Sequence, residues 1–110
     1  MLRSVAAAVA VLTVTTVPLW SGFSAAKAQS IDVGRELLAT NCSGCHATEA
    51  SGESPHAGAP PFRDLHLRYD VEELEEALVE GITAHPDMPV FTFEPDQAAS
   101  IIAYLKSLSS

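Results

Sequence analysis

Cys42-Ser43-Gly44-Cys45-His46 is the stretch of this sequence that decides the fold. Residues three and four positions apart lie on one face of a helical turn, so Cys42, Cys45 and His46 can act together on one bound group. Two cysteines at this spacing, followed at once by a histidine, form the attachment motif of a c-type haem. We therefore predict that Cys42 and Cys45 form thioethers to the haem vinyl groups and that His46 binds the iron.

Two other uses of this motif fit the sequence less well. A zinc site needs about four ligands, and a further pair of cysteines or histidines at zinc-binding spacing is missing. A thioredoxin-like dithiol needs a strand–helix–strand context, which the pattern does not show, and it would leave His46 without a role. Haem attachment is the favoured interpretation.

The first residues have the pattern of an export signal. Arg3 gives a positive start, Val5 to Val17 is apolar, and Ala26-Lys27-Ala28 is a small-x-small cleavage site. We predict a signal peptide over residues 1–28, cleaved after Ala28, and one domain over residues 29–110. A retained membrane anchor is the alternative, but the apolar run contains threonines and is shorter than the ~20 residues of a membrane span.

Composition agrees with an exported haem protein. Both cysteines of the chain are in the motif, where haem attachment protects them from forming a disulfide in an oxidising compartment. A domain over residues 29–110 buries little surface on folding. We therefore expect the covalently bound haem to stabilise it and to form its core, and we expect the protein without haem to be poorly folded.

The charge of the chain restricts its partners. The formal net charge is −8, and removal of Arg3 and Lys27 with the signal peptide makes the rest more acidic. Nucleic acid is an implausible partner, because phosphate binding depends on Lys and Arg. We expect a monomer that meets larger redox proteins, with a basic docking face as the favoured complement and simple solubility as the alternative explanation.

The rest of the pattern is helical, and no segment alternates like a half-buried strand. Residues 49–61 have the composition of a loop. Asp70, with Glu73, predicts the start of a helix that Gly81 ends, and Glu94-Pro95 begins the last helix. We predict an all-α fold with these apolar stripes: Ile31, Val33, Leu37 and Leu38; Val71, Leu74, Ala77 and Leu78; Ala98, Ile101, Ile102, Leu105 and Leu108. The other face of the middle helix is acidic, either a solvated face or a docking patch: Glu72, Glu75, Glu76 and Glu80.

Met88 is the leading candidate for the second iron ligand. It is the only methionine besides Met1, and Pro89 restrains its loop. A thioether ligand favours Fe(II) and raises the reduction potential, as electron carriers require. A gap-filling core methionine is the alternative. His85 is the competing ligand, whereas His56 and His66 are expected to be surface or partly buried residues.

With the Cys42 to His46 motif followed by Met88-Pro89, residues 30–110 resemble a small class I cytochrome c of the bacterial periplasmic type. The resemblance implies helices wrapped around one covalently bound haem c, and a non-enzymatic role in shuttling single electrons in the periplasm. It also implies that the Pro60 carbonyl accepts the Nδ1–H of His46, and that Gly34 and Tyr104 lie where the first and last helices cross.

The chain departs from the family at several positions. Leu38 stands where an aromatic residue is frequent, and Ala59 where glycine is. The lysine-rich docking ring of mitochondrial cytochrome c is absent, since Lys106 is the only lysine after Ala28. Arg63 and Arg68 can pair with haem propionates or form surface ion pairs.

Two further classes of function stay open at this point. One is a haem-bearing subunit or partner of a periplasmic oxidoreductase. The other is a peroxidase-like or ligand-sensing haem protein, which requires Met88 to leave the iron. A filled sixth position disfavours both.

Overall fold

The computed structural model describes residues 4–17, 23–81, 83 and 85–109, and the side chains from residue 30 onward in its first helix. The helices are α1 (Phe23–Asn41), α2 (Leu74–Glu80) and α3 (Pro95–Leu108), and two 3₁₀ turns, η1 (Phe62–Leu67) and η2 (Val71–Glu73), lie between α1 and α2. The described residues contain no strand. The prediction of an all-α fold is confirmed.

Helix α1 buries the face that carries Gly34 and Leu38, which lie four positions apart and therefore on one side. Ile31 and Leu37 pack at the margin of the core. Val33, which we expected in the same stripe, is 41% exposed. The expectation that Val33 is buried is therefore wrong. Val33 lies about 100° around the helix from Gly34, which is on the buried face.

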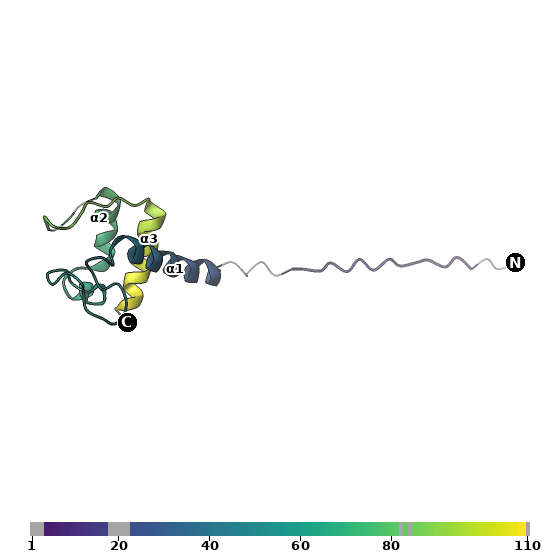
Figure 1. The fold of residues 1–110 in the computed structure, drawn as a ribbon. Coiled ribbons are helices and arrows are strands. Elements are labelled where there is room, and N and C mark those ends of the chain that lie inside the picture. The colour runs from purple at the N-terminus through teal and green to yellow at the C-terminus, as the bar shows by residue number, and fades with distance from the viewer. Residues whose placement is uncertain (1–3, 18–22, 82, 84, 110) are drawn as a thin grey trace.

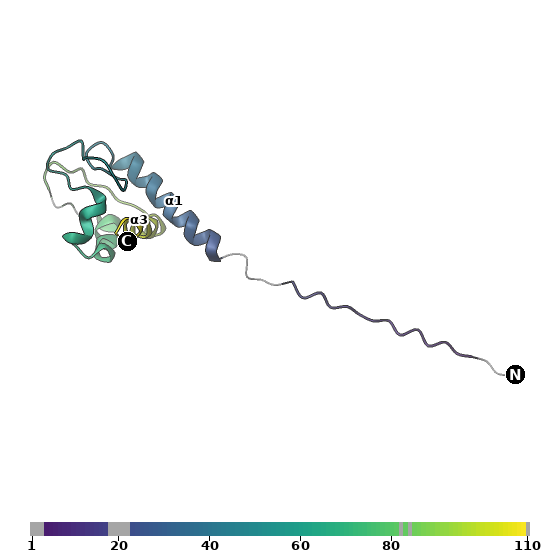
Figure 2. The ribbon, with the colours of Figure 1, turned by 90° about the horizontal axis from the view of Figure 1, so that it is seen from below.

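Helices α1 and α3 cross at Gly34, and this contact organises the fold. A Cβ at Gly34 would clash with the carbonyl oxygen of Ser100 and lie 2.6 Å from its carbonyl carbon. Only glycine lets the two backbones approach this closely. Figure 2 shows α3 almost along its axis, with α1 lying across it.

The segment before α2 differs in detail from the expected capping box. The Asp70 carboxylate accepts a hydrogen bond from the backbone N–H of Glu72, at 3.1 Å, and not from Glu73. The reason is that residues 71–73 form a 3₁₀ turn, which is tighter than an α-helical one and brings the amide of Glu72 nearest. Gly81 ends α2 with a φ of 80°, as predicted.

Helix α3 begins as expected, with Glu94 as N-cap and Pro95 as the first helical residue. The Gln97 side chain accepts a hydrogen bond from the backbone N–H of Glu94, at 3.0 Å. The inner face of α3 supplies most of the core, whose buried members are Leu38, Phe62, Val71, Ile101, Ile102, Tyr104 and Leu105.

Residues 4–17 leave the helical part as an extended segment (Figure 1). Helix α1 continues across the predicted cleavage site after Ala28, and the signal-peptide boundary stays a prediction. In the described part of the chain, no helix combines the length and the apolar character needed to cross a bilayer.

Candidate haem site

The Cys42 to His46 segment is a direct continuation of α1. The amide of Cys42 donates to the carbonyl of Leu38 at 2.8 Å, and the amide of His46 donates to the carbonyl of Cys42 at 2.9 Å. These are helical hydrogen bonds, so the segment forms one more turn. The turn places Cys42, Cys45 and His46 as the spacing requires.

Neither cysteine forms a disulfide with another described residue, and Cys42 is half-buried while Cys45 is exposed. Burial, helped by the neighbouring Cys45, raises the pKa of the Cys42 thiol to about 11. Before haem attachment, the Cys42 side chain therefore keeps its proton at neutral pH.

His46 is held from two sides. Its Nδ1 lies 2.7 Å from the carbonyl oxygen of Pro60, and its ring stacks on Phe62 with centroids 4.6 Å apart and an interplanar angle of 29°. A carbonyl can only accept, so Nδ1 carries the proton and donates it. The lone pair of Nε2 is then the one available to iron.

The Pro60 to Phe62 segment is itself anchored to the motif. The amide of Phe62 donates to the carbonyl of Ala47 at 2.9 Å, and the Phe62 side chain is 8% exposed. Two more bonds hold the loop between these points: Ala47 N–H to the Ser54 hydroxyl oxygen at 3.0 Å, and His56 N–H to the carbonyl of Cys45 at 3.1 Å.

Tyr104 ties the same loop to α3. Its hydroxyl donates to the carbonyl oxygen of Thr48 at 2.6 Å and lies 3.2 Å from Glu49 Oε2. Arg35 of α1 pairs with the other oxygen of Glu49 at 2.9 Å. Burial, with the negative charge of Glu49, raises the pKa of Tyr104.

Met88 and His85 lie in one turn between α2 and α3, in the light-green segment of Figure 1. The amide of Met88 donates to the carbonyl of His85 at 3.1 Å, and the amide of Asp87 donates to His85 Nδ1 at 3.1 Å. Met88 is 36% exposed and His85 is also exposed. Between described residues, no hydrogen bond or ring contact joins this turn to the Cys42 to His46 segment.

The remaining candidates lie outside these contacts. His56 and His66 are exposed, within the range we expected. Arg63 is half-buried, and its Nη1 is buried without a hydrogen-bond partner. Arg68 is exposed, and neither arginine forms an ion pair with another described residue.

Three features were missed from the sequence: the stacking of Phe62 on His46, the unpartnered nitrogen of Arg63, and the Tyr104 to Thr48 bond. Only the last had a usable signal. A tyrosine on the buried face of a helix needs a partner for its hydroxyl, although the sequence does not say which one.

The residues present fit a covalently bound haem. Two unpaired thiols flank a turn that ends in an imidazole, and the engaged Nδ1 leaves Nε2 as the donor. Residues 31–109 match the family described as cytochrome c. This chain belongs to the cytochrome c family.

A relative of this cytochrome c is the cytochrome c-553-like protein of Synechocystis sp., which is 32% identical over 77 residues, covering 70% of this chain and 68% of that protein. No solved structure matches the chain. Membership of the family implies a haem-bearing electron carrier, and Cys42 and Cys45 agree with covalent attachment of haem c.

Proposed function

We propose that this cytochrome c is a soluble, single-haem electron carrier of the periplasm, released by cleavage after Ala28. His46 and Met88 would bind the iron, and Cys42 and Cys45 would hold the haem through thioethers. When bound, the haem supplies an iron that cycles between Fe(II) and Fe(III). The observation that carries the proposal is the 2.7 Å hydrogen bond from His46 to Pro60.

The chain's own residues prepare the site for electron transfer. The Pro60 carbonyl fixes the tautomer of His46 and makes its Nε2 a stronger donor. Phe62 fills one side of the imidazole and is 8% exposed, so it limits the access of water to that side. Because these groups are held by the backbone, little has to move when the iron changes charge.

Met88 completes the proposed ligand pair. Its turn is fixed by hydrogen bonds to His85 and is followed by Pro89, so the thioether sits on a restrained backbone. Arg68, exposed and without an ion pair to a described residue, is the proposed partner of a haem propionate.

The proposed partners are larger redox proteins that present a basic face to a monomer of this chain. Four glutamates of η2 and α2 are exposed: Glu72, Glu73, Glu76 and Glu80. One of them, Glu72, is paired with Lys106 at 2.6 Å, which leaves the others to complement cations of a partner.

The test is a redox titration of the protein matured together with haem-attachment machinery. We expect a coloured protein with one haem per chain and a reversible one-electron transition. The reduced form should not bind carbon monoxide rapidly, because Met88 fills the sixth position. Fast, stoichiometric carbon monoxide binding would contradict the carrier and favour a ligand-binding or peroxidase-like haem protein. N-terminal sequencing of the exported protein should begin at Gln29.

A further inference from the structure

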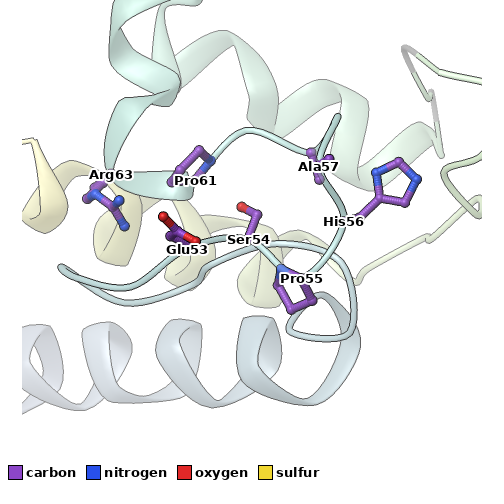
Figure 3. A pocket seen from close by; sticks show the side chains of 8 residues that line it. Glu53, Ser54, Pro55, His56, Ala57, Pro61 and Arg63 are labelled. Atoms are coloured by element: carbon purple, nitrogen blue, oxygen red, sulfur yellow. The ribbon is translucent and has the colours of Figure 1, made fainter.

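The loop between the haem motif and η1 forms a solvent-open pocket of about 360 Å³ (Figure 3). The proposed function assigns no role to this pocket. It is lined by residues 53–57 and by Ala59, Pro61 and Arg63. We call it the loop pocket.

Arg63 brings a guanidinium to the lining of this pocket. Its Nη1 is buried and has no hydrogen-bond partner. A buried charged N–H group without an acceptor is costly, so the position calls for an acceptor of negative charge. Figure 3 shows the Arg63 guanidinium at the same end of the pocket as Glu53.

Ser54 supplies a second donor. Its hydroxyl oxygen accepts the amide of Ala47 at 3.0 Å, which leaves the hydroxyl hydrogen to donate. His56 is not needed, since its Nδ1 accepts the amide of Gly58 at 3.2 Å and its ring points away from the other labelled side chains in Figure 3. Two donors that line one pocket, one of them charged, suit an oxyanion.

Glu53 decides which oxyanion fits. Its carboxylate lines the same pocket and forms no ion pair with Arg63. It repels an anion that has lost all its protons, but it accepts a hydrogen bond from one that keeps a proton. Sulfate keeps none at neutral pH, and phosphate monoesters lose their last proton near pH 6. Inorganic hydrogen phosphate keeps one.

We propose that the loop pocket binds inorganic hydrogen phosphate. Arg63 and Ser54 donate to its oxygens, and Glu53 accepts its O–H. The site lies beside Pro60, the partner of His46, but its occupation does not depend on which residue is the sixth ligand of the iron.

The test follows backbone amide shifts of the reduced, haem-loaded protein during titration with potassium phosphate at constant ionic strength. We expect saturable shifts within residues 53–63 and a Kd in the millimolar range. Sodium sulfate and glycerol phosphate should bind at least tenfold more weakly. If phosphate and sulfate give equal shifts, or phosphate gives none that saturate, the proposal is wrong.

Variants assign the roles. Arg63→Gln should weaken phosphate binding at least tenfold, whereas Arg68→Gln, a matched change at an exposed arginine, should leave it unchanged. Glu53→Gln should keep phosphate binding and bring sulfate to within threefold of it. Unchanged phosphate binding in Arg63→Gln would overturn the proposal and leave that guanidinium for another acceptor, such as a haem propionate. If Arg63→Gln does not fold, the result for Glu53→Gln decides. A pocket that does not bind phosphate has no preference for phosphate over sulfate that this substitution can remove.

Discussion

His46 has its two ring nitrogens in different environments, and this asymmetry defines the site. Nδ1 is engaged by Pro60 while Nε2 is available. Five consecutive residues were enough to predict haem attachment at Cys42 and Cys45, because that chemistry needs the three side chains within one turn. Membership of the family agrees with this attachment, and His46 as the ligand stays a prediction. That Met88 is the sixth ligand of the iron stays a prediction.

Met88→Ala tests that ligand. We expect haem to stay attached, since Cys42, Cys45 and His46 are untouched, and the reduction potential to fall by more than about 0.1 V, because axial ligands set haem potentials over a range of about 0.8 V. The weak far-red absorption band of methionine-ligated ferric haem should vanish. His85→Ala is the control: it removes the bond from Asp87 to the imidazole but keeps the backbone bond from Met88 to the carbonyl of residue 85, so it should keep both the band and the potential. The opposite pattern would make His85 the ligand.

Phe62→Leu tests the stacking on His46. An imidazole bound to Fe(III) carries more positive charge than one bound to Fe(II), and the negative face of an aromatic ring stabilises it. Loss of an interaction of roughly 0.5–1 kcal/mol should raise the midpoint potential by about 20–40 mV. Phe93→Leu, the same change at a residue that has no recorded ring contact with His46, should leave the potential where it is. A lower potential in Phe62→Leu would refute this role.

At the scale of the elements, the contact of α1 with α3 depends on one missing side chain. Gly34→Ala should destabilise the haem-loaded protein by about 1–3 kcal/mol, because its methyl group meets the backbone of Ser100, which cannot rotate away. Chemical denaturation measures the change. Gly58→Ala, whose added Cβ would be 3.5 Å from the His56 ring and in ordinary contact, is the matched control. Equal stabilities of the two variants would show that the helices can move apart freely.

Tyr104→Phe tests the tie between α3 and the loop after the haem motif. Removing the hydroxyl leaves the Thr48 carbonyl without this donor, so we expect a loss of about 1–2 kcal/mol in the free energy of unfolding. The raised pKa of Tyr104 also gives a pH dependence. The folded protein keeps a proton that the unfolded chain releases near pH 10, so stability should decline as pH rises above about 10. The decline should be shallower in Tyr104→Phe. Identical slopes would mean that Tyr104 does not titrate differently in the two states.

At the scale of the whole molecule, we expect the negative net charge to govern encounters; it is −8 for the full chain and more negative after the proposed cleavage. Oxidation of the reduced protein by a small cationic complex should slow as ionic strength rises, and oxidation by an anionic complex should accelerate, because salt screens attraction and repulsion over about 10 Å at 0.1 M. Stopped-flow absorption of the haem measures both rates. If neither rate changes with ionic strength, the electron leaves the protein away from the acidic surface, and a basic partner is no longer favoured.

The sequence by itself determined the helical class, the cofactor motif, the Gly81 and Pro95 helix boundaries and the acidic surface, because each of these depends on residues close together in the chain or on composition. Only the tertiary structure decided that Val33 faces outward, that Phe62 stacks on His46 and that Tyr104 binds the Thr48 carbonyl. The last two are contacts between residues far apart in sequence, and Val33 faces outward because α1 turns its Gly34 side to α3. The loop pocket is also decided by tertiary structure, since Glu53 and Arg63 line it together in a loop that the Ala47 to Phe62 hydrogen bond closes.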